Sequence, residues 1–310
     1  MIRQPIPNTT LSVSPICLGL GDLGTRVTGA AAVHLLETLL AAGGNFVDTA
    51  HCYGFWGPGG TGASERELGQ VLRVLDCRAD LVIATKGGHP AVDPDYPRAD
   101  AYLSPEVLAS DVGESLDRLG VAAIDLYLLH RDDTRVPVGE IIDSLNTHVA
   151  AGRLRALGAS NWSTGRIAAA NAYAAAHGLA GFVVSQIQFS LATPQFPVTA
   201  DPTMRYMTPE TAAWHTHTAL PVMAYSASAG GFFAGRDGGY ATPENLARRD
   251  RARTLAAELS VTPAQLALAY LLAQPFPVFP IVGTLDESHL TESLAAAQIR
   301  LTPAQVAYLR

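Results

Sequence analysis

The chain has 310 residues, of which 48% are apolar and 16% are charged, and its formal net charge is −7 at pH 7. This composition excludes a disordered chain, because the apolar side chains are numerous enough to fill a large core. It also argues against nucleic-acid or membrane-surface binding, since there is no excess of positive charge to attract phosphate groups.

Eight short segments rich in Val, Ile, Leu and Phe predict β-strands, and a segment of helical periodicity follows each. Parallel neighbours need such crossover connections, and eight units in about 300 residues are typical of a closed (β/α)8 barrel, an α/β fold. The predicted strands are residues 16–20, 45–50, 81–86, 125–130, 156–160, 183–189, 222–227 and 278–283.

Five helix starts are marked by a hydroxyl residue followed by proline, which suits the first helical position. They are Ser104-Pro105, Thr208-Pro209, Thr242-Pro243, Thr262-Pro263 and Thr302-Pro303, and the last two also have the glutamine of a capping box. The helix at Thr302 lies beyond the last strand, so we expect extra C-terminal helices. The segment before residue 16, with Pro7-Asn8 as a turn, predicts a hairpin that caps the barrel floor. No linker interrupts residues 1–310, which we interpret as a single domain.

Gly19, Gly21 and Gly24 match the dinucleotide-binding pattern G-x-G-x-x-G after a strand, and Asp48 stands where a ribose-binding acid would be. We reject a Rossmann fold because the helical pattern starts only near Ala30, and because six further strand–helix units follow at even spacing. The glycines instead predict a first strand that ends tightly beneath a bound ligand.

Polar residues end three consecutive predicted strands, where a (β/α)8 barrel gathers its functional groups. Asp48 ends the second strand, with His51 and Tyr53 just beyond, Lys86 ends the third and His130 ends the fourth. Lys86 is the single lysine among 21 basic residues. Taken alone, each residue has an ordinary structural explanation as a cap, a loop aromatic or a core histidine. Together on adjacent strands they indicate a catalytic site.

These groups together predict a tuned proton donor. An unperturbed tyrosine has a pKa near ~10. A lysine ammonium about 4 Å from the phenolate is worth roughly 4 kcal/mol at an effective dielectric near 20. We therefore expect Lys86 to lower the pKa of Tyr53, less whatever Asp48 neutralises, and His130 to hold a substrate oxygen beside the Tyr53 hydroxyl. Such a set protonates an oxyanion and needs no metal.

In combination these motifs resemble the aldo-keto reductase family over essentially the whole chain. Asp48-Thr-Ala-His-Cys-Tyr53-Gly54 with Ser64-Glu65 is similar to the first family signature, and Lys86, His130, Gly158-Ala-Ser-Asn161-Trp162 and Gly283-Thr284 follow in the family's order. The resemblance implies reversible NAD(P)H-dependent reduction of an aldehyde or ketone. It makes Tyr53 the acid (or base, in oxidation), Lys86 and Asp48 its tuning pair and His130 the orienting donor.

The resemblance also implies a cofactor site. Its nicotinamide end would be held by Ser160, Asn161 and Gln186, with Tyr225 stacked on the ring. The backbone amides that meet the pyrophosphate would come from Ser226, Ala227, Ser228, Gly230 and Gly231, and the adenosine end would lie at Gly283, Thr284, His289 and Glu292.

The adenosine end departs from the family pattern, because Leu285 stands where a basic residue is common and Ser293 replaces an asparagine. A 2′-phosphate would have to be met by Thr284, His289 or an arginine of the run 248–253. That run is equally compatible with a solvated helix face. We expect NADPH from the family, with NADH as the alternative.

Residues beyond the strand ends predict the substrate pocket: Phe55, Trp56, His89, Arg131, Trp162, Phe232 and Phe233. The aperiodic connection 193–208 predicts a pocket wall or lid. Sugars, aryl carbonyls and small ketones all remain open as substrates. Cys52 is interpreted as a small packed side chain, with oxidation sensitivity as the alternative. The pair His215 and His217 has no neighbouring cysteine or acid, so we expect no metal.

A different class of function is a cofactor-sensing or partner-binding barrel that turns over little substrate. The complete set of Asp48, Tyr53, Lys86 and His130 argues against it, because a binding module needs no tuned phenol. The cysteines are Cys17, Cys52 and Cys77, an odd number in a long chain. The N-terminus lacks the apolar core of a signal peptide, and the chain has no run of roughly 18 apolar residues. Together with the odd number of cysteines, these features predict a cytoplasmic protein. The sequence gives no prediction of the oligomeric state.

Overall fold

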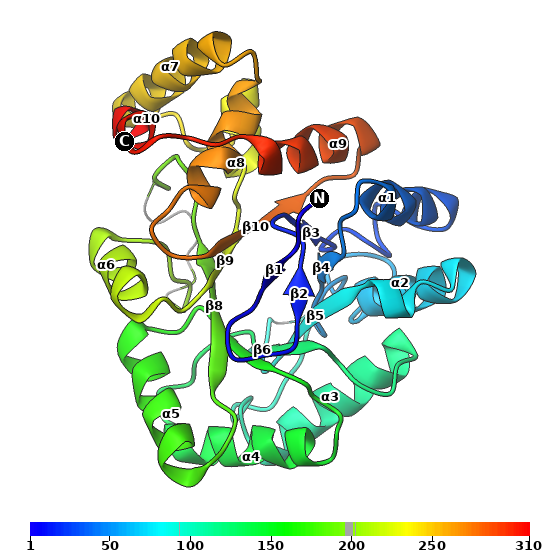
Figure 1. Cartoon of the computed structure of the whole chain (residues 1–310). Helices are drawn as coiled ribbons and strands as arrows, with labels where there is room; N and C mark the ends of the chain where they lie inside the picture. The colour runs from blue at the N-terminus through cyan, green and yellow to red at the C-terminus, as the bar shows by residue number, and fades with distance from the viewer. Residues whose placement is uncertain (93, 196–200, 202) are drawn as a thin grey trace.

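The computed structural model describes residues 1–92, 94–195, 201 and 203–310. Eight parallel strands form a closed barrel in the order β10-β3-β4-β5-β6-β7-β8-β9, with helices around it (Figure 1). The predicted (β/α)8 barrel is confirmed. The barrel strands are β3 (Cys17–Gly19), β4 (Phe46–Asp48), β5 (Val82–Gly87), β6 (Leu126–Leu129), β7 (Leu157–Ser160), β8 (Phe182–Gln188), β9 (Val222–Tyr225) and β10 (Val278–Gly283).

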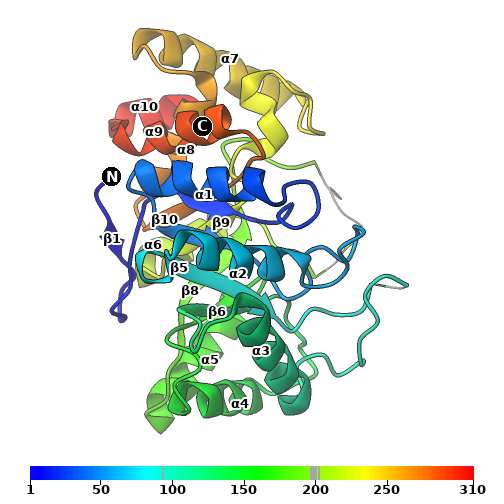
Figure 2. The ribbon, with the colours of Figure 1, turned by 90° about the vertical axis from the view of Figure 1, so that its right-hand side faces the viewer.

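An antiparallel hairpin of β1 (Gln4–Pro5) and β2 (Ser12–Val13) precedes the barrel, as predicted. Figure 2 shows it on one side of the barrel, opposite the loops that project after β5. Ile6, Leu11 and Val13 of this hairpin pack with the side chains inside the barrel. The hairpin therefore closes the end of the barrel that is remote from the carboxyl ends of the strands.

The helices are α1 (Ala30–Ala41), α2 (Ala63–Leu75), α3 (Pro105–Leu119), α4 (Val138–Ala150), α5 (Thr164–His177), α6 (Pro209–Thr218), α7 (Pro243–Glu258), α8 (Pro263–Leu272), α9 (Glu287–Ala295) and α10 (Pro303–Leu309). Short 3₁₀ turns are η1 (Arg78–Asp80), η2 (Ala229–Ala234) and η3 (Ala296–Gln298). All five predicted hydroxyl caps accept a backbone N–H, and Thr262 and Thr302 form complete capping boxes.

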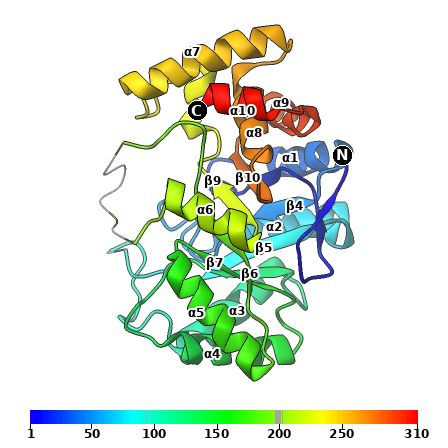
Figure 3. The same cartoon turned by 60° about the vertical axis from the view of Figure 1, so that its left-hand side comes forward.

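The extra C-terminal helices are also confirmed. Figure 3 shows α7 crossing one side of the molecule above α8, with α10 beside it. Helix α8 packs against β10, and α7 packs against both α8 and α10. In the part of the chain that the structure describes, no single helix has the length and apolar character to cross a membrane; α7 and α8 meet that test only as a pair bent by 97°.

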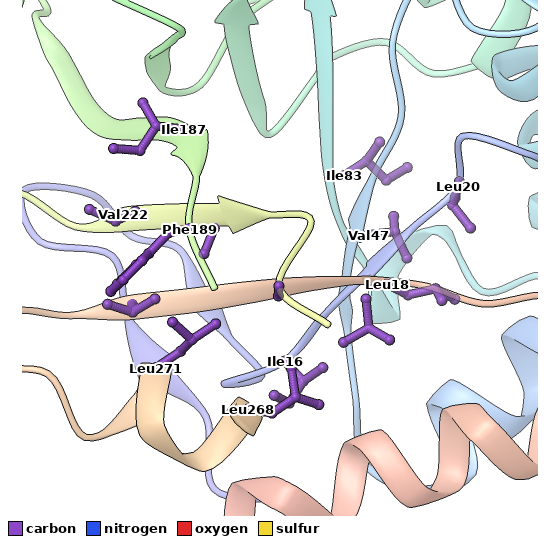
Figure 4. Close-up of a cluster of buried hydrophobic side chains, with 14 of the residues drawn as sticks. Ile16, Leu18, Leu20, Val47, Ile83, Ile187, Phe189, Val222, Leu268 and Leu271 are labelled. Atoms are coloured by element: carbon purple, nitrogen blue, oxygen red, sulfur yellow. The ribbon is translucent and has the colours of Figure 1, made fainter. Parts of the chain in front are cut away.

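The core has two layers because successive residues of a strand point to opposite faces of the sheet. Outward-facing residues such as Ile16, Leu18, Val47 and Ile83 pack against the helices (Figure 4). Inward-facing residues fill the barrel: Cys17, Phe46, Ala84, Leu126, Leu128, Ala156, Val184, Met223, Phe279 and Ile281. The inside of the barrel is therefore a packed core, and the polar groups lie at its open end, where the strands have their carboxyl ends.

Candidate active site

Strand alternation brings the polar residues of the barrel to one place. Asp48 lies two residues after the inward-facing Phe46, Lys86 two after Ala84, and His130 two after Leu128. The same spacing puts Ser160, Gln186 and Tyr225 above Gly158, Val184 and Met223. Each side chain thus points into the barrel at the carboxyl end of its strand.

Lys86 is the centre of the catalytic group. Its ammonium is fully buried and donates to Asp48 Oδ2 at 2.7 Å, to the Thr49 carbonyl at 2.8 Å and to the Tyr53 hydroxyl at 3.0 Å. Asp48 Oδ1 accepts from Gln186 Nε2 at 2.8 Å, so both carboxylate oxygens are engaged. The predicted juxtaposition of Tyr53, Lys86 and Asp48 is therefore present in the structure.

The pKa of Tyr53 differs from our expectation. Burial raises it above its ordinary value, the Lys86 ammonium lowers it, and the net direction is upward. The expectation of an unusually acidic phenol is thus wrong for the site as it stands, because desolvation of the phenolate outweighs the ammonium. Burial also acts to lower the pKa of Lys86, but the adjacent Asp48 carboxylate and the Tyr53 oxygen together more than offset it, and the net direction is upward. Tyr53 therefore keeps its proton while Lys86 stays charged.

His130 stands beside Tyr53, with the two ring centroids 5.7 Å apart. Burial lowers its pKa well below the ordinary histidine value, so the ring is neutral. His130 Nδ1 lies 3.5 Å from Cys52 Sγ, and burial raises the pKa of that thiol to about 12. The His89 ring packs edge-on against His130 at 4.7 Å between centroids. A neutral imidazole, a protonated thiol and a second imidazole thus meet at this corner.

A chain of hydrogen bonds joins the catalytic group to the residues expected to bind the cofactor. Gln186 Oε1 accepts from Ser160 Oγ at 3.4 Å, and Ser160 Oγ accepts from Asn161 Nδ2 at 3.1 Å. Asn161 Oδ1 in turn accepts from the Tyr225 hydroxyl at 2.8 Å. Asn161 has a positive φ of 61°, an unfavourable backbone for a non-glycine residue that is common at functional sites.

Two cavities meet at Tyr53 and Tyr225, which line both. A groove of about 320 Å³ runs outward over the ends of β3, β9 and β10, and is lined by Gly19, Leu20, Gly21, Asp22, Leu23, Val27, Leu35, Asp48, Ser226, Ser228, Gly230, Ile281, Gly283, Thr284 and Leu285. A second cavity, of about 310 Å³, is lined by Cys52, Phe55, Trp56, His89, His130, Arg131, Ser160, Asn161, Gln186 and Met204. Tyr53 is therefore at the junction of an elongated groove and an aromatic pocket.

A larger cavity of about 470 Å³ lies between α6, α8 and the end of the chain at Arg310. It is lined by Arg248 but by none of the four catalytic candidates. The candidate active site is therefore at the junction of the two smaller cavities, which the candidate catalytic residues line.

The sequence model of the aldo/keto reductase family matches residues 15–310. The chain belongs to the aldo/keto reductase family. A 6-dehydroglucose reductase of Novosphingobium aromaticivorans is 31% identical over 301 residues, covering 96% of this chain and 90% of the relative. An aldo-keto reductase named ausK from Emericella nidulans is 30% identical over 331 residues, covering 98% and 79%.

Among solved structures, a thermostable aldo-keto reductase in complex with the inhibitor epalrestat matches with a TM-score of 0.75 and 22% identity, covering 100% of this chain and 98% of that one. This likeness supports the fold. Membership of the aldo/keto reductase family makes the protein an oxidoreductase for carbonyl groups that uses a nicotinamide cofactor.

Several residues expected in this reductase's substrate pocket lie elsewhere. Trp162 is buried and packs against Phe182, with centroids 5.2 Å apart, because the positive φ of Asn161 turns the chain away from the pocket. Phe232 and Phe233 are buried against each other in η2. The predictions for these three residues are wrong. The middle of the predicted wall 193–208, residues 196–200 and 202, lies outside the described residues, whereas Met204 near its end lines the pocket.

At the adenosine end, the structure places some expected contacts away from the groove. Glu292 accepts from the Thr262 hydroxyl at 2.6 Å, so its carboxylate serves the start of α8. Ala227 is fully buried, Gly231 packs near Arg236, and neither they nor His289 line the groove. Arg248 bonds to Glu244 and to the Arg310 carbonyl, and it lines only the distant larger cavity.

Sequence reasoning missed the residues that support the site from behind. His51 Nε2 lies 3.0 Å from Glu114 Oε2 on α3, and His51 Nδ1 lies 3.0 Å from the Tyr96 hydroxyl. Asp111 accepts from the Gly88 amide at 2.8 Å and pairs with Arg98. This network fixes the loop after β5 that carries His89. The partners in these contacts are 13 to 63 residues apart along the chain, so no local pattern identifies them.

Proposed function

We propose that this aldo/keto reductase reduces an aldehyde or ketone reversibly, with Tyr53 as the general acid in reduction and the base in oxidation. The observation that carries the proposal is the position of the Tyr53 hydroxyl. It lies at the junction of both cavities and 3.0 Å from a fully buried ammonium. A proton donor there is adjacent both to a groove for a dinucleotide and to a pocket for a carbonyl compound.

The groove fits a dinucleotide cofactor. Gly21 and Gly283 both line it, and a Cβ at either would meet no atom within 4 Å, so a side chain there would project into the groove. Gly19 lies at its floor, where a Cβ would come within 2.8 Å of Ile281. Ser160, Asn161, Gln186 and Tyr225 would hold the nicotinamide end, and the serines of 226–228 and Gly230 the phosphates. When bound, a reduced nicotinamide supplies the hydride that the carbonyl carbon accepts.

The chain's own residues handle the proton. As the carbonyl carbon gains the hydride, its oxygen takes the proton of the Tyr53 hydroxyl and leaves a phenolate. Lys86 stabilises that phenolate from 3.0 Å, and Asp48 keeps Lys86 charged. Because burial keeps the pKa of Tyr53 high, the proton moves only to an oxygen that is becoming an alkoxide. Solvent then returns a proton to Tyr53.

His130 orients the carbonyl oxygen. We assign the Cys52 thiol as a donor to His130 Nδ1, across the 3.5 Å between them. The raised pKa of Cys52, about 12 through burial, keeps the thiol protonated for this role. The single ring proton of neutral His130 then lies on Nε2, from which it donates to the substrate oxygen.

For the substrate, we infer a sugar or aryl carbonyl. Phe55 and Trp56 form an aromatic wall 4.9 Å apart, next to Tyr53, and aromatic faces suit both aryl rings and sugar rings. Arg131 on the opposite side supplies donors, although Asp201 shares its charge at 3.3 Å. The 6-dehydroglucose reductase among the relatives supports the sugar class.

The decisive test compares Tyr53→Phe with Tyr173→Phe, a matched loss of one hydroxyl from a half-buried tyrosine of α5 that lines neither cavity. Oxidation of NADPH is followed with a panel of sugar and aryl carbonyls. General acid catalysis contributes about 10² to 10⁴ in rate. We expect a loss of that size in Tyr53→Phe and none in Tyr173→Phe. Wild-type turnover in Tyr53→Phe would refute the assigned acid. If the wild-type protein bound the cofactor but reduced none of the carbonyl compounds, the alternative of a sensing barrel would be favoured.

We further propose that NADPH is preferred over NADH. Thr284 lines the outer end of the groove, and His289 lies in the first turn of α9 just beyond it. Arg26 is exposed beside the groove residue Val27. The paired test is a fluorescence titration with each cofactor. Equal affinity would refute the preference and would indicate that Asp286 and Glu287, at the same end, dominate the local field.

We also propose a cytoplasmic location. The three cysteines are free and buried, which supports it.

A further inference from the structure

Three ligand atoms of the substrate pocket converge, and the proposed reduction uses only those of Cys52 and His130. Cys52 Sγ and one ring nitrogen each of His89 and His130 all lie within 4.8 Å of one another, and the three side chains are buried. All three also line the 310 Å³ cavity, so a small ion can reach them. One thiol and two imidazoles are a preferred donor set for zinc.

We propose that Cys52, His89 and His130 form an inhibitory binding site for Zn²⁺ inside the substrate pocket. The binding part of this proposal stands on the geometry alone. Its inhibitory part rests on the proposed function of the pocket.

The spacing of the donors fits a tetrahedral ion. Zn–S bonds of ~2.3 Å and Zn–N bonds of ~2.0 Å require an S···N separation of roughly 3.5 Å. Cys52 Sγ and His130 Nδ1 already lie 3.5 Å apart. The separations of His89 from the other two donors have to shorten by at most about 1.3 Å for S···N and about 1.5 Å for N···N from the 4.8 Å limit, which small side-chain rotations supply.

His89 is held in the state that a metal ligand needs. Its Nδ1 lies 2.8 Å from the Pro90 carbonyl, so Nδ1 carries the proton and donates, and Nε2 remains for the ion. Histidine ligands characteristically donate their second ring nitrogen to a carbonyl or carboxylate in this way. The nearest cations are paired, Lys86 with Asp48 and Arg131 with Asp201, which reduces their repulsion of an incoming ion.

Binding replaces the Cys52 S–H bond by an S–Zn bond and releases one proton to solvent. The ion takes Nδ1 of His130 and fills the space beside Tyr53. The fourth position faces the cavity, where water completes the coordination. We therefore expect Zn²⁺ to exclude the carbonyl substrate and leave the cofactor groove accessible.

The experiment titrates the full-length protein with ZnCl₂ by calorimetry, and with CoCl₂ by absorption, because a cobalt–thiolate bond gives a near-ultraviolet charge-transfer band. The variants are Cys52→Ala and His89→Gln, and the control is Cys77→Ala, which removes another buried thiol far from the pocket. We expect one ion per wild-type chain, at least about tenfold weaker binding in both pocket variants, and wild-type binding in the control. The cobalt band should be present in the wild type and the control and absent in Cys52→Ala.

Kinetics add a second measurement. Zn²⁺ should raise the apparent KM for the carbonyl substrate and leave the cofactor KM unchanged, and the inhibition should be lost in Cys52→Ala relative to that variant's own rate without zinc. Wild-type zinc affinity in Cys52→Ala, or a cobalt complex without the thiolate band, would overturn the site. If the protein binds zinc through Cys52 but reduces no carbonyl compound, the site stands and the proposed function fails.

Discussion

Replacing the one lysine tests how this reductase stabilises its phenolate. Lys86→Met keeps the length of the side chain and removes the charge. The lost groups are a hydrogen bond of 3.0 Å to Tyr53 and an ion pair of 2.7 Å with Asp48, both in a fully buried setting. The variant therefore removes electrostatic support without opening a large cavity.

The size of the effect follows from these distances. At an effective dielectric near 20, a charge about 3 Å from the phenolate contributes roughly 5 kcal/mol. Asp48, at most about 6 Å away, opposes it by roughly 3 kcal/mol. Lys86→Met leaves that opposition in place, so it loses the full contribution of roughly 5 kcal/mol, a fall in kcat of roughly 5,000-fold. Removing both charges loses only the difference of about 2 to 3 kcal/mol, a fall of roughly 30- to 150-fold.

Loss of the ion pair also affects stability, because Asp48 becomes a buried carboxylate without its cation. Breaking one partner of a buried pair typically costs about 3 to 5 kcal/mol. The double variant Asp48→Asn Lys86→Met is the matched control, since it leaves no unpaired charge. We expect thermal unfolding to return towards the wild-type midpoint in the double variant, while NADPH oxidation with a saturating carbonyl substrate recovers only in part and stays roughly 30- to 150-fold below the wild type.

The two measurements separate a catalytic role of Lys86 from a structural one. Recovery of wild-type turnover together with stability in the double variant would contradict the reasoning, because the ammonium would then act only by neutralising Asp48. Full turnover in Lys86→Met itself would refute any electrostatic role.

Two further predictions concern stability. Burial lowers the pKa of His89 to about 4 from 6.5, so the folded chain takes up this proton at lower pH than the unfolded chain. The free energy of unfolding should therefore fall as the pH drops from about 6.5 to about 4, by up to about 3 kcal/mol from His89. Urea unfolding should show a smaller fall with pH in His89→Gln than in the wild type. An equal fall in the two proteins would disprove the assignment. Gly69→Ala should lower the unfolding midpoint, with a cost of about 1 to 3 kcal/mol, because its Cβ would lie 2.4 Å from the Arg118 carbonyl. Gly113→Ala, whose Cβ meets nothing within 4 Å, should stabilise α3 by about 1 kcal/mol. If the unfolding midpoints of Gly69→Ala and Gly113→Ala shifted in the same direction, the packing argument would be contradicted.

The sequence alone predicted the strands, the helix starts and the four candidate catalytic residues that the structure brings together. These features are local: inward-facing residues recur every second position along a strand, and a hydroxyl before proline caps a helix whatever surrounds it. In a parallel barrel, period-two alternation also places Asp48, Lys86 and His130 at one end. The juxtaposition of these candidate residues was therefore predictable from the sequence.

Only the tertiary structure decided what surrounds that group. Burial, which depends on every neighbouring element, reversed the expected direction of the pKa shift of Tyr53. The left-handed backbone of Asn161 turned Trp162 out of the pocket, and α8 engaged Glu292 away from the groove. The meeting of Cys52 with His89 and His130 arises from three separate loops. Desolvation and contacts between distant segments are properties of the closed barrel, and no stretch of sequence contains them by itself.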